Sequence, residues 1–380
     1  MLKRTLAAAV VLAVAVAGVA YVNRKAIVVY LVNEAGKLDV AENRPIEWQR
    51  GLVEAEMPMA DRPPNFVFVL VDELGIYEIS TFGGGVAGGR VPTPNIDRLA
   101  SEGAVFTQAY SGTGTCAPSR AMLMTGRYPT RTGFEYTPTP PGMAPIVGMF
   151  AADMLKEAKR QGSDLPRPVW NYQAAMAAPR FQDMGLPGEE VTIAEVLKEA
   201  GYHTVHIGKW HLGRSAPFRP VSQGFDESLL MASGLYLPED DPNTVNAKLP
   251  FDPIDKFLWA RMQFAVDFDR AGEELSEEPF KPGGYLTDYW TEEALDVIEA
   301  NKNRPFFLYL AHWGVHTPLQ ATREDYEAVG DIEPRRLRVY AAMVRSIDRS
   351  VGRVMDKLEK EGLADNTLIV FSSDNGGAGY

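Results

Sequence analysis

The single cysteine of this chain, Cys116, stands in the run TCAPSRAMLMTGR at 115–127. One cysteine cannot form an internal disulfide. Pro118 suits a first helical turn and Gly126 a helix stop, so we expect a short helix with Cys116 at its N-terminus. Unpaired N–H groups there favour an anion, and Arg120 adds a fixed positive charge. A lone cysteine without this context is most simply interpreted as a small buried apolar residue, whereas these neighbours predict a chemical role.

Two pairs of oxygen-bearing side chains directly follow predicted strands. Such side chains supply only oxygen ligands, which suit a hard cation such as calcium, or alternatively magnesium. An acidic pair after a single strand is more often a solvated turn. Two pairs beside a candidate anion site, on strands that we expect to be neighbours, instead predict a metal site. The pairs are Asp72 with Glu73 and Asp374 with Asn375.

Three basic side chains follow other predicted strands. Lys209 and His211 are two residues apart, so on an extended segment their side chains share a side. His211 and His316 each lie in a loop punctuated by glycine or proline, which favours acid–base chemistry over a structural role. The remaining histidines lie within strands or at strand ends and are expected to be structural: His203, His206 and His312.

Strands and helices alternate along the chain, which implies an α/β fold with a largely parallel sheet covered by helices on both faces. The candidate site residues then gather at the carboxyl edge of the sheet, where ligands bind in open α/β folds. We expect strands at 66–71, 204–207, 306–311 and 368–371, and helices at 94–102, 192–200, 287–301 and 340–361.

Composition limits the function classes. With 380 residues, of which 46% are hydrophobic, the chain can bury one large core or two smaller ones. Its formal net charge of -12 argues against nucleic acid as a partner. An anionic substrate must therefore be held by local positive charge.

The N-terminus carries Lys3 and Arg4 before an uncharged apolar run at 5–22. We expect residues 1–25 to be a membrane anchor or a removed signal peptide, with the main body exported to the periplasm or another extracytoplasmic space. Residues 26–62 form a lead-in, and 63–380 form the catalytic domain.

The signature C-x-P-S-R-x-x-x-x-T-G at Cys116 resembles that of the sulfatase family, whose fold is alkaline phosphatase-like. Five further segments resemble sulfatase motifs in family order. Two stretches, 137–185 and 234–284, match no motif and are interpreted as insertions that shape a substrate mouth. The five segments are PNFVFVLVDELG (64–75), TPNIDRL (93–99), GKWHLG (208–213), VHTP (315–318) and SDNG (373–376).

The resemblance implies the composition of the site. A formylglycine-generating enzyme would oxidise Cys116 to formylglycine, an aldehyde whose hydrate is the nucleophile. Calcium would be held by the oxygens of Asp72, Glu73, Asp374 and Asn375 together with the modified Cys116. The family usually has a second aspartate where this chain has Glu73, so Asp72 is the firmer metal ligand of that pair.

The resemblance also implies the roles of the other site residues in sulfate ester hydrolysis. Arg120 and Lys209 would neutralise negative charge on the transferred group while the modified Cys116 attacks sulfur and becomes sulfated. His316 would protonate the departing alcohol or phenol. His211 would then remove the proton from the remaining hydroxyl, which releases sulfate.

Two alternative functions remain beside the arylsulfatase-like hydrolase. Related enzymes with the same signature hydrolyse phosphodiesters or phosphonate monoesters. An inactive fragment or binding protein is the other, because family members usually continue past Asn375 with another lysine, more strands and a smaller C-terminal domain. We therefore expect this sequence to be a truncated part of a longer protein, with a small-molecule or carbohydrate sulfate ester as its substrate.

Overall fold

The chain divides into two units, of which the smaller consists of helices. The computed structural model describes residues 2–140, 142–160, 173, 177–249 and 252–377. The smaller unit combines Met1–Leu38, Thr139–Ala178 and Lys248–Met262. Its buried cluster centres on Ile146, Phe257 and Leu258. Its main helices are α1 (Leu2–Val22), α2 (Arg24–Gly36), α7 (Met143–Arg160) and α10 (Pro253–Arg261).

No single helix in the described part of the chain is long and apolar enough to cross a membrane. The segments Leu12–Val22 and Arg24–Gly36 meet that requirement only together, and they are bent by 74° at Asn23.

A six-stranded sheet forms the centre of the larger unit, which comprises Asp39–Pro138, Pro179–Ala247 and Gln263–Tyr380. The strand order is β5-β3-β2-β6-β1-β8, and every pairing is parallel except that of β5 with β3. This mixed, largely parallel sheet confirms the predicted fold class. The strands are β1 (Asn65–Val71), β2 (His203–Gly208), β3 (Glu227–Gly234), β5 (Phe264–Arg270), β6 (Phe306–Ala311) and β8 (Thr367–Ser373).

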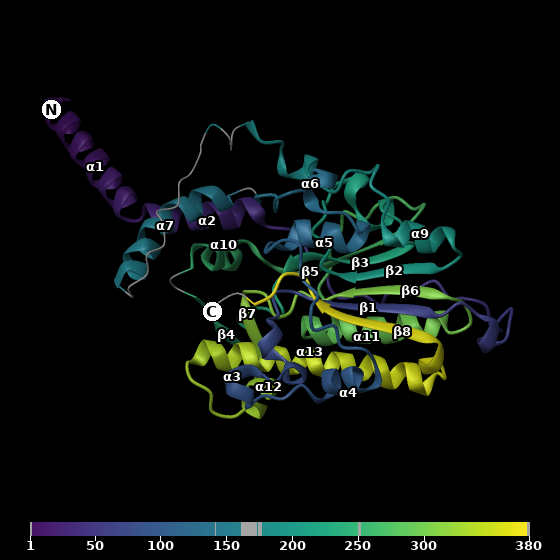
Figure 1. Ribbon diagram of the computed structural model, residues 1–380. Coiled ribbons are helices and arrows are strands. Elements are labelled where there is room, and N and C mark those ends of the chain that lie inside the picture. Colours follow the sequence, from purple (N-terminus) through teal and green to yellow (C-terminus); the bar gives the residue numbers. More distant parts are fainter. Residues whose placement is uncertain (1, 141, 161–172, 174–176, 250–251, 378–380) are drawn as a thin grey trace. The chain divides into compact units, whose positions relative to one another are not determined.

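Helices cover both faces of this sheet (Figure 1). On one face lie α5 (Cys116–Thr125) and α9 (Ile193–Glu199); on the other lie α4 (Pro94–Glu102), α11 (Leu286–Asn301) and α13 (Arg335–Lys360). The core under α5 contains Ala121 and Met124 of the helix together with Phe307 and Tyr309 of β6. Alternate residues of β6 therefore point to opposite helical layers, as expected for a sheet that is buried on both faces.

Smaller elements complete the larger unit. The strands β4 (Thr244–Ala247) and β7 (Leu319–Thr322) form a separate antiparallel pair. Short α-helices are α3 (Val86–Gly89), α6 (Pro129–Thr132) and α12 (Arg323–Ala328). The 3-10 turns are Met59–Asp61, Ile76–Glu78, Ser80–Phe82, Phe181–Asp183, Ala216–Phe218, Pro220–Ser222 and Ala364–Asn366.

All four strands and all five helices predicted from the sequence, including the one at Cys116, are present, with ends that differ by a few residues at most. The capping box of Thr192 and Glu195 forms at the start of α9. Thr93 precedes α4 but makes no side-chain bond to it; its hydroxyl instead accepts the N–H of Ser80 at 3.0 Å. The Thr93 hydroxyl thus takes part in a contact with Ser80 instead of a cap for α4.

Two sheet strands, β3 and β5, were not predicted, and β5 lies within the stretch 234–284. β5 carries three charged side chains, Asp267, Asp269 and Arg270, which obscure its strand pattern, whereas β3 carries one, Glu227, at its first position. In the fold these charges are paired across the sheet: Glu227 of β3 bonds to Arg270 of β5 at 3.0 Å. Arg219 contacts both Asp267 and Asp269. Partners distant in sequence therefore make the burial of these charges possible.

Candidate active site

Cys116 is the first residue of α5, and the helix ends at Gly126, whose φ of 66° gives the left-handed conformation that a helix stop requires. The cysteine side chain is buried. Burial raises the pKa of the Cys116 thiol well above its ordinary value, and nearby carboxylates including Asp72 reinforce the shift against the opposing charge of Lys209. The unmodified thiol is therefore protonated and a poor nucleophile.

Two buried cations and two buried carboxylates form a charge network close to Cys116. Arg120 Nε donates to Asp374 Oδ2 at 3.0 Å, and Arg120 Nη2 lies 3.4 Å from Asp72 Oδ1. Lys209 Nζ donates to Asp72 Oδ2. Arg120 Nη1 also donates to the Lys209 carbonyl at 2.7 Å, which ties the helix to the loop after β2. All four side chains are almost completely shielded from solvent.

The charges in this network shift one another's pKa values. Burial opposes ionisation of Asp72, but Lys209 and Arg120 outweigh it and lower the pKa of this carboxyl. Burial and the neighbouring Asp72 charge raise the pKa of Asp374. Burial likewise favours neutral Lys209, yet Asp72 raises the pKa of its ammonium overall. The site therefore keeps Lys209 and Arg120 cationic at neutral pH.

Two oxygens at this edge fit a hard cation. Asp72 Oδ1 and Asn375 Oδ1 are buried and have no hydrogen-bond donor among the residues that the structure describes. They follow β1 and β8, which are neighbours in the sheet, and Asp374 directly precedes Asn375. Buried oxygens without donors are costly unless a positive group satisfies them. Asp72 and Asn375 therefore fit the predicted calcium or magnesium ion by the chemistry of their oxygens. Both carboxylate oxygens of Asp374 accept hydrogen bonds, from the N–H of Glu73 and from Arg120 Nε, and any bond to a metal would use their remaining lone pairs.

Glu73, the fourth predicted metal ligand, lies differently. Its backbone has a φ of 58°, which is uncommon for a residue with a side chain, and its N–H donates to Asp374 Oδ1 at 3.2 Å. Glu73 Oε1 lies 3.5 Å from His316 Nε2. The turn after β1 thus places the Glu73 carboxylate beside the imidazole of His316.

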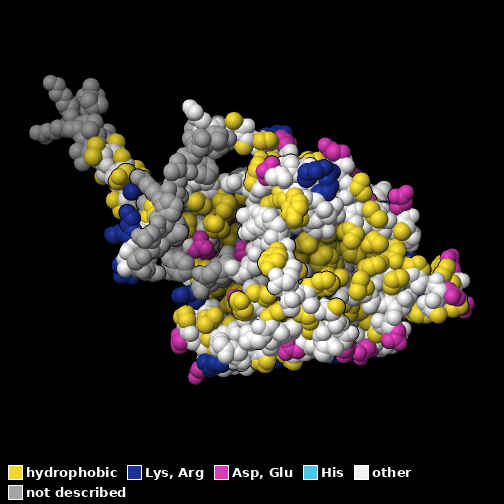
Figure 2. Space-filling model, viewed as in Figure 1, with side chains coloured by type: hydrophobic (Ala, Val, Ile, Leu, Met, Phe, Trp, Pro, Cys, Tyr) yellow, Lys and Arg dark blue, Asp and Glu magenta, His cyan; other side chains and the backbone are white. Residues whose placement is uncertain are grey.

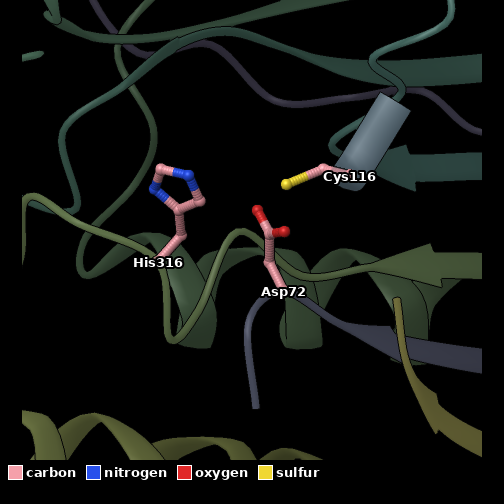
Figure 3. Close-up of side chains that lie close together, drawn as sticks. All are labelled: Asp72, Cys116 and His316. Atoms are coloured by element: carbon pink, nitrogen blue, oxygen red, sulfur yellow. The ribbon is translucent and has the colours of Figure 1, made fainter. Parts of the chain in front are cut away.

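Cys116, Asp72 and His316 converge from three elements that are remote in sequence (Figure 3). One ligand atom from each lies within 4.8 Å of the other two. His316 Nδ1 donates to the carbonyl of Thr317, so Nε2 is the ring nitrogen left to face the centre. An acid or base at His316 would therefore act through Nε2.

His211 is partly buried, with its Nδ1 shielded from solvent, and it also has left-handed backbone geometry, with a φ of 64°. The expected extended segment from Lys209 therefore does not continue through His211, because the chain turns there. Burial, followed by the charges of Lys209 and Arg120, lowers the pKa of His211 well below its ordinary value. Its Nδ1 has no hydrogen-bond partner in the described part of the chain. His211 is thus a neutral imidazole that can accept a proton.

The three histidines that were predicted to be structural make buried hydrogen bonds. In each of them, one ring nitrogen bonds to a side chain of a neighbouring helix or strand. His203 pairs with Glu227 at 3.0 Å, His206 with Ser228 at 2.9 Å and His312 with Ser350 at 2.9 Å.

Sequence reasoning missed Trp313, which follows β6 and lies in the site. Its ring stacks on His316 with centroids 3.9 Å apart and planes at 24°, and Lys209 Nζ lies 4.5 Å from its centroid. The sequence signal was a tryptophan three residues before His316, in the same loop. Only the folded loop shows that this ring touches two candidate site residues.

Comparison with known proteins identifies related chains. A model of the Sulfatase family matches residues 64–380. N-acetylgalactosamine-6-sulfatase of Mus musculus is 33% identical over 333 residues, covering 86% of this chain and 52% of that protein. Arylsulfatase H of Homo sapiens is 30% identical over 364 residues, covering 83% of this chain and 57% of that protein.

A solved structure shares the fold. The crystal structure of Ps i-CgsB in complex with k-i-k-neocarrahexaose has a TM-score of 0.59 and 31% sequence identity, and the match covers 83% of this chain and 59% of that chain. The present chain spans about half the length of the curated relatives it matches.

Proposed function

This chain belongs to the sulfatase family, and from that premise we propose that its site hydrolyses sulfate esters with a formylglycine formed from Cys116 and a bound calcium ion. The observation that carries the proposal is the convergence of Cys116, Asp72 and His316 within 4.8 Å, beside buried Arg120 and Lys209. Arg120 and Lys209 are balanced by Asp72 and Asp374, so a bound calcium ion would supply the excess positive charge that a sulfate group needs in a chain of net charge -12.

Calcium would be held by Asp72, Asp374 and Asn375, whose oxygens fit a hard cation. When present, calcium supplies positive charge opposite the sulfate oxygens, and formylglycine supplies an oxygen nucleophile in its hydrated form. The buried and protonated thiol of Cys116 supports the need for conversion, because it is a weak nucleophile as it stands.

The other side chains have roles that their environments support. Arg120 and Lys209 bind the sulfate oxygens and neutralise the charge that grows on them. His316 donates a proton from Nε2 to the departing oxygen, since its Nδ1 is engaged by Thr317. His211 is held neutral by burial and accepts a proton in the step that releases sulfate.

Carbohydrate sulfate esters are the proposed substrate class. One relative is named an N-acetylgalactosamine-6-sulfatase, and the structure of Ps i-CgsB contains k-i-k-neocarrahexaose. Both names point to sugar alcohols as the group from which sulfate is removed. Aryl sulfates, suggested by the relative named arylsulfatase H, serve as chromogenic substitutes in the assays.

Export is the proposed location. Lys3 and Arg4 precede the apolar run at 5–22, and this arrangement supports translocation of the main body out of the cytoplasm. Expression in a Gram-negative host followed by fractionation and N-terminal sequencing tests this. Full-length chain in the membrane fraction indicates an anchor, and a shortened chain in the periplasm indicates a removed signal. Retention in the cytoplasm contradicts export.

The experiment for the activity starts with the full chain, made with and without a formylglycine-generating enzyme. Peptide mass spectrometry across Cys116 reports conversion, and 4-nitrophenyl sulfate and bis(4-nitrophenyl) phosphate report turnover. We expect conversion together with sulfate ester hydrolysis that exceeds phosphodiester hydrolysis. Preferred turnover of the phosphodiester would overturn the sulfatase assignment, and converted protein without turnover of either ester would favour an inactive chain.

Cys116→Ala supplies the matched control. We expect this variant to lose all hydrolysis and to keep calcium affinity within a few-fold, because Asp72, Asp374 and Asn375 lie on other loops. Isothermal titration with calcium measures the second property independently of turnover. Hydrolysis by Cys116→Ala would contradict the formylglycine mechanism.

A further inference from the structure

Trp313 touches two of the proposed catalytic groups at once. Its indole stacks on the His316 imidazole, with a centroid separation of 3.9 Å and an interplanar angle of 24°. Lys209 Nζ lies 4.5 Å from the same indole centroid. The proposed proton donor and a proposed sulfate-binding cation therefore share one aromatic neighbour.

The indole is itself held firmly. Trp313 is buried with 3% of its surface exposed, and its Nε1 donates to the Gly234 carbonyl at 2.8 Å. A Cβ added at Gly234 would lie 3.0 Å from Nε1, so the strand end at Gly234 leaves just enough room for the ring. Trp313 is thus anchored to β3 while it contacts residues that follow β6 and β2.

Stacking complements the hydrogen bond that His316 already makes. The bond from Nδ1 to Thr317 fixes the rotation of the imidazole within its plane, and contact with the indole fixes the plane itself. Together these two contacts point Nε2 toward the centre that contains Cys116 and Asp72. Loss of the indole leaves one of the two constraints.

The indole of Trp313 also contacts the Lys209 ammonium and holds it in place. This ammonium is buried near the guanidinium of Arg120 and bonds to Asp72. The electron-rich face of an indole attracts a cation but carries no net charge. It can therefore hold Lys209 in place without competing with the sulfate group as another carboxylate would.

We propose that Trp313 is a positioning residue for sulfate ester hydrolysis, holding the His316 ring and the Lys209 ammonium simultaneously. This proposal rests on the proposed function. It assigns Trp313 no contact with the reacting atoms.

The kinetic test compares Trp313→Leu with Trp313→Phe in converted full-length protein. The substrates are 4-nitrophenyl sulfate, with a good leaving group, and phenyl sulfate, with a poor one. For Trp313→Leu we expect kcat to fall about 10- to 100-fold on phenyl sulfate and much less on 4-nitrophenyl sulfate, because only the poor leaving group needs a well-placed proton. KM should rise on both substrates because Lys209 is less well held.

Trp313→Phe keeps an aromatic face, so it should recover most of kcat and KM although the bond to Gly234 is lost. Trp48→Leu is the matched control, since it also removes a buried indole and its N–H bond, in this case to Glu293 at 2.7 Å. We expect no leaving-group dependence in that control. Equal kcat losses on both substrates in Trp313→Leu, or a Trp313→Phe as impaired as Trp313→Leu, would overturn the proposal.

A second measurement needs no activity and separates this proposal from the proposed function. In unconverted protein with labelled histidine, the His316 ring protons, assigned with His316→Ala, should be shifted upfield by the stacked indole. Trp313→Leu should remove that shift and Trp313→Phe should keep part of it. An unshifted His316 signal in the unsubstituted chain would overturn the positioning role, whereas a shifted signal in a protein without sulfatase activity would contradict only the proposed function.

Discussion

At the residue scale, the site works by compensation between buried charges. Arg120 contacts both Asp72 and Asp374, and Lys209 contacts Asp72. Each charge in this network therefore has a neighbour of opposite charge. Buried charges of this kind add little net stability as pairs, but removal of one partner is costly. This charge network therefore keeps two cations close to Cys116, and it depends on each of its members.

Arg120→Met tests this dependence. The substitution keeps much of the side-chain volume but leaves Asp72 and Asp374 without the guanidinium, so we expect a loss of about 3–5 kcal/mol in the free energy of unfolding. Urea denaturation at pH 7.5 measures it. A loss below about 1 kcal/mol would show that Lys209 alone compensates the two carboxylates.

At the element scale, contacts at the two ends of β2 connect this strand to its neighbours and to the site. At the amino ends of β2 and β3, His203 bonds to Glu227 and lies 3.4 Å from Asp226, and Glu227 also accepts the N–H of Gln49 in the lead-in. At the carboxyl end of β2, Gly208 has a φ of 111° and approaches the Ala311 carbonyl of β6 closely. The contacts of Glu227 attach the lead-in to the sheet. The backbone conformation of Gly208 directs the chain toward Lys209.

His203 makes stability depend on pH. Burial and the charge of Arg304 lower its pKa, but Asp226 and Glu227 outweigh them and raise it above 6.5. The stabilisation is therefore complete below pH 6.5 and is lost as pH rises through the folded-state pKa. Asp226 and Glu227 have lowered pKa values and stay ionised across this window.

His203→Gln should consequently cost more stability at pH 6 than at pH 8. Comparison with the unsubstituted chain at each pH cancels the contributions of the other histidines, and urea denaturation gives both values. An equal cost at the two pH values would argue that His203 is not protonated in the fold.

Gly208→Ala should disturb the end of β2. The new Cβ would lie 2.0 Å from the Ala311 carbonyl, in addition to the strain of a positive φ. Gly201→Ala is the matched control, because Gly201 has a φ of 90° but no atom within 4 Å of the added Cβ. We expect Gly208→Ala to be less stable than Gly201→Ala by about 1–3 kcal/mol. Thermal unfolding of both variants checks the difference, and equal melting temperatures would contradict the close approach.

At the scale of the whole molecule, β8 is the outer strand of the sheet in the described part of the chain, and it pairs with β1. Leu368 and Val370 point to one face of β8 and are 51% and 39% exposed. Figure 2 shows hydrophobic side chains gathered in the region where β8 runs in Figure 1. An outer strand with exposed apolar side chains promotes association between chains.

We therefore expect this 380-residue chain to self-associate through β8. The double substitution Leu368→Lys with Val370→Lys should reduce association, as measured by sedimentation velocity over a range of concentrations. Val53→Lys is the control, since Val53 is 95% exposed but lies outside the sheet. An equal reduction in the control would mean that added charge, rather than the β8 surface, governs association.

The sequence by itself determined the elements whose signals are local. Strands such as Phe306–Ala311 are continuous apolar runs, and the helix at Cys116 is bounded by proline and glycine, so neighbours in sequence were enough to predict both. The residues after the strands were identifiable for the same reason, because parallel strands bring their carboxyl ends to one edge. Asp72, Lys209, His316 and Asp374 could therefore be placed at one edge of the sheet from the sequence.

Only the tertiary structure decided which groups actually meet. β5 carries Asp267 and Asp269, whose partner Arg219 lies about fifty residues earlier, so a local pattern could not predict this strand. Glu73 lies beside His316, and Trp313 stacks on the His316 ring. Both contacts depend on how the loops after β1 and β6 fold at the edge of the sheet. Side-chain burial and through-space charge depend on residues far apart in the chain, and therefore the position of each group within the site was settled by packing.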